Sequence, residues 1–250
     1  MNDTTRTLRR ASLTAGLGLA LMAVLAAFGV FGATAPSITE GDAAQTARDI
    51  LGAAALFRWG VVCLVVVVVL DIVVATALLT LFEPVNRGMA LAAAWFRVAY
   101  AAVYLVAILQ LVLALDLLDE PEQAMRAIDA YQAIWLVGLV LFGVHLLLVG
   151  HLAYRSGFMA KIFGVLLVVA GLGYVVDGFA AVLRSGPTVS VAQFTFVGEV
   201  ALIGWLLAVG RRKNFHTRGL VRPDTADTST SSAGPLTPAH PRPVGVGKPS

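Results

Sequence analysis

The chain has 250 residues, of which 58% are hydrophobic and 13% are charged, and its mean hydropathy is +0.84. Soluble domains carry about 25% charged residues, so this composition excludes an ordinary soluble domain and indicates one α-helical membrane domain. The net charge of +3 does not point to nucleic acid as a partner, because the basic residues flank apolar segments, where they orient a membrane protein. The lone cysteine, Cys63, excludes an intrachain disulfide and a multi-cysteine metal site.

Six apolar segments are long enough to cross a bilayer core of roughly 30 Å as helices. They cover residues 11–35, 52–82, 90–117, 131–152, 161–183 and 191–210. Polar loops are expected between them, including residues 36–51, the turn at 83–87 and the acidic stretch 116–129. The first segment has two interpretations, since Ala33-Thr34-Ala35 also has the form of a signal-peptide cleavage site. Its apolar run of about 22 residues exceeds the ~7–15 of a signal peptide, which favours a retained helix.

Basic residues predict how the six-helix domain, residues 11–211, is oriented. Eleven lie on one side and three on the other: Arg6, Arg9, Arg10, Arg87, Arg155, Lys161, Arg211, Arg212, Lys213, Arg218 and Arg222 against Arg48, Arg126 and Arg184. Both termini are therefore expected in the cytoplasm, with the protein in a bacterial inner membrane and residues 1–10 as a short cytoplasmic segment. Residues 212–250 are rich in Pro, Ser, Thr and Gly, so we expect a disordered cytoplasmic tail there.

Charged residues inside the apolar segments are the candidate functional residues. Asp71 lies near the middle of the second segment, where a lone acid costs about 2.5–3.5 kcal/mol and therefore needs a partner. Counting from the segment ends places Asp71, Arg97 and His145 at similar depth, and we expect them to form an inner cluster. The same count predicts an outer cluster of Arg58, Gln110, Asp177 and Glu199.

The two clusters have two interpretations. One is a polar pathway, as in a transporter or proton relay. The other is a set of buried ion pairs that fix helix packing, and this interpretation is slightly favoured, because buried polar groups specify packing in some systems. Intramembrane hydrogen bonds contribute only about 0.6 kcal/mol on average, so seven such groups are many to retain for packing alone.

No sequence motif predicts a catalytic or cofactor site. HExxH, GxSxG, GxGxxG and P-loop patterns are missing from the sequence. His145 and His151 are six residues apart and do not share a helix face, so neither a haem nor another cofactor is expected. Ser156-Gly157 is better explained as a turn between helices, and Gly171 and Gly173 as close helix contacts.

Four stretches carry a resemblance to a known family: LDIVVATALLTLFEPVNR, AAAWFRVAYAAVYLVAIL, FGVHLLLVGHLAYRSGFMAKIFGVLLVVAGLGYVVDGF and GEVALIGWLL. They contain, in order, Asp71, Arg97, His145, Ser156-Gly157, Gly164, Gly171, Tyr174, Asp177 and Glu199. Over about residues 10–211 the chain resembles the bacterial membrane family called domain of unknown function 4386. The resemblance implies an integral membrane protein of six or seven helices with a retained first helix, and it implies no activity.

Three classes of function follow. A transporter for a small solute or protons is the leading hypothesis, because it uses the intramembrane charges. A membrane-embedded sensor or interaction subunit without catalysis is the alternative, because the loops are small and no catalytic motif is present. An intramembrane enzyme comes last. The lipid bilayer is the one partner that the sequence predicts, while a protein partner or a homo-oligomer is left open.

Overall fold

The computed structural model describes residues 3–183 and 197–211, and within these ranges it contains helices and no strands. The helices are α1 (Asp3–Ala27), α2 (Ala43–Gly52), α3 (Ala54–Phe82), α4 (Arg87–Asp116), α5 (Pro121–Arg155), α6 (Lys161–Leu183) and α8 (Val197–Arg211). A π-helical stretch, Phe28–Thr34, and a 3-10 turn, Ala35–Ser37, continue α1. The all-α class is therefore confirmed. The predicted tail, residues 212–250, lies outside the described residues.

Five of the expected spans are confirmed as long apolar helices. The first covers Arg6–Ser37 and has 32 residues. The other four are α3, α4, α5 and α6, with 29, 30, 35 and 23 residues. At about 1.5 Å per residue, even α6 is about 35 Å long and can cross a bilayer core of roughly 30 Å. The described part of the sixth expected span is α8, which has 15 residues and a length of about 22 Å. Residues 191–196 of that expected span, and Arg184 before it, lie outside the described residues.

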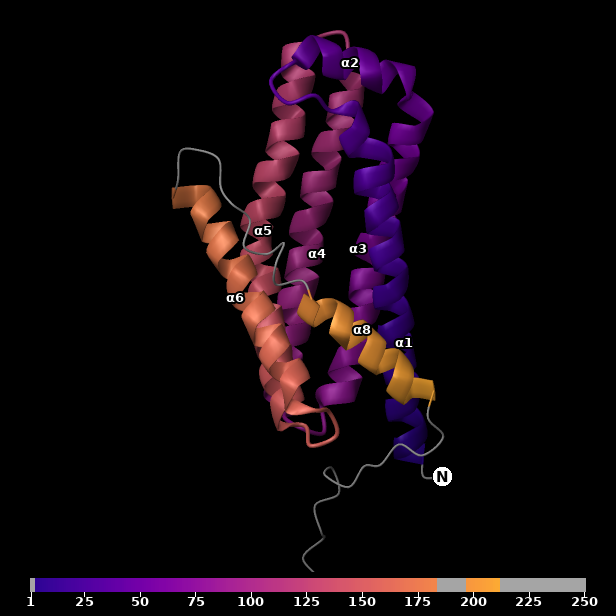
Figure 1. The fold of residues 1–250 in the computed structure, drawn as a ribbon, viewed down its shortest axis with the longest axis vertical. Helices are drawn as coiled ribbons and strands as arrows, with labels where there is room; N and C mark the ends of the chain where they lie inside the picture. Colours follow the sequence, from indigo (N-terminus) through magenta and orange to yellow (C-terminus); the bar gives the residue numbers. More distant parts are fainter. Residues whose placement is uncertain (1–2, 184–196, 212–250) are drawn as a thin grey trace, which may run out of the picture. The chain divides into compact units, whose positions relative to one another are not determined.

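The long helices pack as consecutive antiparallel neighbours (Figure 1). α3 packs on α4, α4 on α5 and α5 on α6, while α1 lies along α3 and the shorter α8 crosses α1 and also contacts α6. This connectivity brings residues 83–86 and 156–160 to one end of the bundle, called the turn end below. The opposite end holds residues 117–120 and α2, which contacts α5, and is called the α2 end.

The two turns at the turn end are formed by residues suited to them. Asn86 is the N-cap of α4, and its side chain accepts a hydrogen bond of 3.0 Å from the Met89 amide. Gly157 has a φ of +69°, the left-handed conformation that favours glycine at the end of a helix. The Ser156 hydroxyl donates to the Ala153 carbonyl at 2.8 Å. The expectation that Ser156-Gly157 forms a turn between helices is thus confirmed.

Glycines allow α5 and α6 to touch along their backbones. Two pairs of glycines face each other, Gly143 with Gly171 and Gly150 with Gly164. The two pairs are seven residues apart along each helix. A Cβ atom added at Gly171 would lie 2.7 Å from the Gly143 carbonyl oxygen, and one added at Gly164 would lie 2.7 Å from the Gly150 oxygen. Small residues at such positions are the usual device for close helix packing in membranes. The expected close contact at Gly171 is confirmed.

The π-helical stretch after α1 is also a site of close packing. The Thr34 hydroxyl donates to the Gly29 carbonyl, five residues earlier, at 3.0 Å, which satisfies an oxygen that the wider turn leaves available. Gly29 lies against Gly60 of α3, since a Cβ atom on either glycine would lie 3.0 Å from the carbonyl oxygen of the other. The first span is therefore fitted against α3 by backbone contact.

Two expected loops contain helices. Helix α1 begins at Asp3, so most of the polar segment 1–10 is helical as well. The expected loop 36–51 contains α2, which buries Ala43, Ala47 and Ile50 at helical spacing and is capped by Asp42. The expected acidic loop 116–129 is mostly the start of α5, because Pro121 stands in the first helical turn, where it is tolerated.

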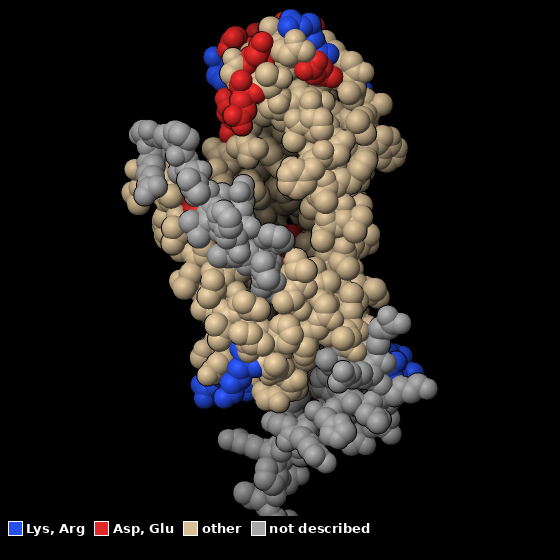
Figure 2. Space-filling view, in the orientation of Figure 1, with Lys and Arg blue, Asp and Glu red and all other residues tan. Residues whose placement is uncertain are grey.

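The outer surface of the long helices is apolar. Large hydrophobic side chains are exposed on each of them, for example Val24, Val69, Leu109, Val137 and Val176. Figure 2 shows that the charged side chains of the face in view gather at its two ends, with acidic residues near α2, and that the surface between is almost uncharged. Such a broad apolar surface suits contact with lipid acyl chains.

Candidate functional site: a buried polar centre

Asp71, Arg97 and His145 form a polar centre at one depth in the bundle. They come from the three neighbouring helices α3, α4 and α5. Asp71 lies eleven residues before Phe82, where α3 ends, and Arg97 lies ten residues after the start of α4 at Arg87. His145 lies ten residues before the end of α5. At about 1.5 Å per residue all three are about 15 Å from the turn end, close to the middle of a bilayer core.

The Arg97 guanidinium connects the three helices. Its Nη2 lies 2.7 Å from Asp71 Oδ1, and its Nη1 lies 3.1 Å from His145 Nε2. The exposed fractions of the Arg97 and Asp71 side chains are 3% and 2%, so the ion pair is fully desolvated. Desolvation costs free energy, and the mutual attraction of the two charges offsets part of that cost. The structure thus brings the three residues of the expected inner cluster into direct contact.

The contacts of His145 define its tautomer. Its Nδ1 lies 2.8 Å from the Ala93 carbonyl oxygen, which can only accept a hydrogen bond. Nδ1 therefore carries the proton and donates it. Arg97 can only donate, so His145 Nε2 must be the acceptor of the second contact. Both contacts are satisfied by a neutral imidazole, which leaves Arg97 with one charged partner, Asp71.

Further side chains complete the surroundings of Arg97. Its guanidinium carbon lies 5.5 Å from the centre of the Phe142 ring, a cation–π arrangement. The Met22 sulfur of α1 lies 3.9 Å from Arg97 Nη2. The buried Arg97 Nε has no hydrogen-bond partner among the described residues. The guanidinium therefore keeps one donor that could serve another acceptor.

Tyr174 and Glu199 extend the centre toward α6 and α8. The Tyr174 hydroxyl donates to Glu199 Oε1 at 2.7 Å. The Tyr174 ring meets Phe142 edge-on, with the ring centres 5.4 Å apart. The Glu199 carboxyl lies within electrostatic range of both Arg97 and Asp71. Glu199 was expected in the outer cluster, and its electrostatic interactions include the central pair Arg97 and Asp71.

The other residues of the expected outer cluster lie on α3, α4 and α6. Arg58 is exposed, one turn after the start of α3, where a long side chain can extend to the membrane–water interface. Gln110 is half-buried on α4. Asp177 is buried on α6, one turn after Tyr174, and lies within electrostatic range of its hydroxyl.

Sequence reasoning missed the aromatic side chains around the centre. Phe142 lies between Tyr100, His145 and Tyr174, with ring-centre distances of 4.9, 5.8 and 5.4 Å. The Tyr100 hydroxyl accepts a hydrogen bond of 3.3 Å from the Trp135 indole. Helical spacing held a signal for two of them, because Tyr100 is three residues after Arg97 and Phe142 is three residues before His145.

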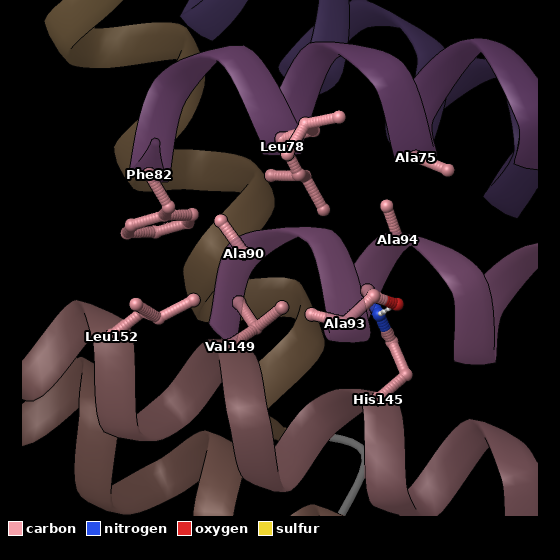
Figure 3. A pocket seen from close by; sticks show the side chains of 10 residues that line it. Ala75, Leu78, Phe82, Ala90, Ala93, Ala94, His145, Val149 and Leu152 are labelled. Carbon is pink, nitrogen blue, oxygen red and sulfur yellow. Dashed lines mark hydrogen bonds between the residues drawn. The ribbon is translucent and has the colours of Figure 1, made fainter. Parts of the chain in front are cut away.

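A narrow crevice joins the polar centre to the turn end. Figure 3 shows it between α3, α4 and α5, with the His145 ring at one end, hydrogen-bonded to Ala93. Apart from His145 its walls are apolar, and four of the ten lining residues are alanines, among them Ala75, Ala90 and Ala94. The crevice has no room for a water molecule in this conformation.

The centre has the groups for charge or proton exchange. It contains an ion pair, a neutral imidazole and a second carboxyl with a hydroxyl partner. Among residues 3–183 and 197–211, no three His, Cys, Asp or Glu side chains are arranged to hold a metal ion.

Five membrane-length apolar helices around a desolvated charged centre define a multi-pass α-helical membrane protein. The chain belongs to the family described as "Domain of unknown function (DUF4386)", whose model matches residues 14–210. The resemblance found in the sequence is thereby confirmed. An uncharacterized protein of Archaeoglobus fulgidus is 33% identical over 155 residues, which are 62% of this chain and 85% of the relative. No solved structure matches the chain.

Proposed function

We propose that the protein is a membrane transporter for a small solute or for protons, and that the Asp71–Arg97–His145 centre is its functional site. The observation that carries this proposal is the complete burial of a charged pair at mid-depth. Charged residues in this position are rare and costly, and they usually belong to substrate, ion or proton pathways. A buried ion pair adds little net stability, so packing alone is a weak reason for its presence.

The balance of charge supports exchange at this centre. Asp71 pairs with Arg97, and the Glu199 carboxyl lies within electrostatic range of the same guanidinium. If both were ionised, the centre would carry a net negative charge in a region of low dielectric. Uptake of a proton or another small cation would neutralise it. A site whose charge changes with occupancy is what a transport cycle requires.

A sensor or interaction subunit is the second candidate, and the close packing around the centre favours it. The crevice beside His145 has no room for water, and the Gly143–Gly171 and Gly150–Gly164 contacts hold α5 against α6 without a gap. In that case the ion pair would fix the register of α3, α4 and α5, and no solute would cross.

We also propose that the turn end faces the cytoplasm of a bacterial cell, with both termini on that side. Arg87, Arg155 and Lys161 lie at the turn end, and Arg6, Arg9 and Arg10 lie in the first turns of α1. The positive-inside rule assigns such an end to the cytoplasm.

The experiment that tests transport uses full-length protein in liposomes with an internal pH-sensitive dye and an imposed solute or pH gradient. Wild-type protein should produce flux above empty liposomes. The double variant Asp71→Asn with Arg97→Gln removes both buried charges and should lose the flux while it still reconstitutes. The matched control removes the exposed pair Glu83–Arg87, of 3.2 Å, by Glu83→Gln with Arg87→Gln, and should keep the flux. Full flux in the variant that lacks both buried charges would show that the centre serves helix packing and not transport.

A further inference from the structure

Building on the proposed transport function, we propose that the transported ion is a proton, and that Glu199, held by the Tyr174 hydroxyl, is the group that binds and releases it. Asp71 and Glu199 are the two carboxyl groups near Arg97, and they have different partners. Asp71 faces the guanidinium at 2.7 Å, whereas Glu199 accepts a hydrogen bond of the same length from a neutral hydroxyl. Asp71 therefore has a dedicated counter-ion, and Glu199 has a dedicated neutral donor.

This difference decides which acid exchanges a proton. An ionised carboxylate that leaves water without a paired cation is costly, and such a group becomes neutral by binding a proton. Asp71 avoids that cost through its ion pair with Arg97. Glu199 avoids it by protonation, and its Oε1 still accepts the hydrogen bond from Tyr174 in the neutral form.

Arg97 couples the two acids. With Glu199 neutral, one positive and one negative charge remain, and the pair with Asp71 is balanced. When Glu199 releases its proton, the new negative charge lies within electrostatic range of Arg97, whose buried Nε has no partner among the described residues. Arg97 can then stabilise both carboxylates. Glu199 releases its proton to water as H⁺ and takes up a proton from water in the reverse step. Tyr174 keeps its own proton, and no other group changes its charge.

The charged and titratable groups that face Glu199 come from several helices. Tyr174 of α6 donates to it, and Arg97 and Tyr100 of α4 and Asp71 of α3 lie within electrostatic range of it. Asp177 of α6 lies within electrostatic range of the Tyr174 hydroxyl. The Ser12 hydroxyl of α1 donates to the carbonyl of Leu206, which lies two turns of α8 after Glu199. The arginines of α1, Arg6, Arg9 and Arg10, come before Ser12 in the chain.

A proton fits this centre better than a larger cation does. The contacts among Arg97, Asp71 and His145 are direct, with distances of 2.7 and 3.1 Å. The crevice on the His145 side of the centre has no room for a water molecule, so it offers no site to a hydrated metal ion or an organic cation. A proton binds to a carboxyl oxygen without a cavity of that size.

The direct test is infrared difference spectroscopy of the full-length protein in membranes, between neutral and acidic pH. We expect a C=O stretching band of a protonated carboxylic acid that is lost in Glu199→Gln. Tyr174→Phe removes the hydrogen bond to Oε1 and should shift that band to higher frequency, as expected for a carbonyl that loses a donor. Glu122→Gln, an exposed residue in the first turn of α5, is the matched control and should leave the band unchanged. Identical bands in wild-type and Glu199→Gln protein would overturn the assignment of Glu199, and an unshifted band in Tyr174→Phe would overturn the role of Tyr174.

Flux measurements separate this inference from the transport proposal. Proton flux into liposomes should fall to the level of empty liposomes in Glu199→Gln and should be partly restored in Glu199→Asp, which keeps an exchangeable carboxyl group. A Glu199-dependent band without proton flux in the wild type would leave the protonation site intact and refute transport of protons. Wild-type proton flux that is unchanged in Glu199→Gln would keep transport and refute the inference. Flux of another solute without protons would refute the inference as well.

Discussion

Arg97 is suited to its position because a guanidinium donates in several fixed directions. It reaches Asp71 with Nη2 and His145 with Nη1 while its carbon lies over the Phe142 ring. The three donors of a lysine ammonium sit on one nitrogen, so a lysine could not keep these three separate contacts at once. The side chain that is hardest to bury in a membrane is thus held by partners on α3 and α5, and it joins these helices to its own.

The ion pair should show strong energetic coupling. Asp71→Asn leaves Arg97 as an unpaired buried cation, and Arg97→Gln leaves Asp71 as an unpaired anion, so each should lower the free energy of unfolding by about 3–5 kcal/mol. The double variant should lose less than the sum of the two, because no uncompensated charge remains. Thermal unfolding in detergent of all four proteins measures the coupling.

The exposed pair Glu83–Arg87 provides the control for this cycle. Its side chains are 48% and 82% exposed, so its coupling should be about 0–1 kcal/mol. Strictly additive losses for Asp71 and Arg97 would contradict a stabilising contact between them.

Depth along a helix was enough to predict that Asp71, Arg97 and His145 lie at one level, but it did not show which groups surround Glu199. Asp71, Arg97 and His145 lie on long helices whose ends were predicted within a few residues, apart from the start of α5, so counting placed them well. Glu199 was counted from the end of a full span, whereas the described α8 has only 15 residues and crosses α1. Tyr174 was noted only as part of the family pattern, because nothing in a single sequence shows that a tyrosine on α6 faces an acid on α8.

Helices α5 and α6 are in close contact, and the sequence contains a signal for that contact. Glycines on both helices recur every seven residues, at 143 and 150 on α5 and at 164 and 171 on α6. This spacing keeps them on one face along the whole contact. Helix α2 has no such signal, because its apolar side chains repeat over only ten residues, and the sequence predicts a loop there. Short amphipathic helices give too few repeats to stand out from a polar loop.

Substitution of Gly171 should separate α5 from α6. Gly171→Val places a branched side chain whose Cβ would lie 2.7 Å from the Gly143 carbonyl oxygen, and a backbone atom cannot move aside without shifting the helix. We expect a loss of at least about 1–3 kcal/mol of unfolding free energy, the usual cost of overpacking. Thermal unfolding in detergent measures it.

Gly204 is the matched control for this substitution. It lies on the apolar helix α8, and a Cβ atom there would meet nothing within 4 Å. Gly204→Ala should therefore keep or slightly raise stability, by up to about 1 kcal/mol, because alanine favours helix more than glycine does. Equal losses for Gly171→Val and Gly204→Ala would show that close contact between α5 and α6 is not the cause.

Five of the six expected spans follow from composition as long apolar helices, but the side on which each loop lies needs the basic residues as well. Long apolar helices must satisfy all backbone groups internally, so the five long spans were predictable from hydropathy alone. Their antiparallel order in the structure fixes which loops share an end, whichever way the bundle is inserted. Only the distribution of Lys and Arg predicts that the turn end is cytoplasmic.

Single cysteines in a Cys63→Ala background should report this orientation in intact cells. Exposed positions at the two ends offer matched pairs, Glu40 and Asp119 at the α2 end and Gly88 and Ala160 at the turn end. Glu40→Cys and Asp119→Cys should react with a membrane-impermeant thiol reagent added outside, because the α2 end is expected to face away from the cytoplasm. Gly88→Cys and Ala160→Cys should react only after permeabilisation. The reverse pattern would invert the bundle in the membrane, and reaction of only one member of either pair would contradict the antiparallel arrangement of α3 to α6.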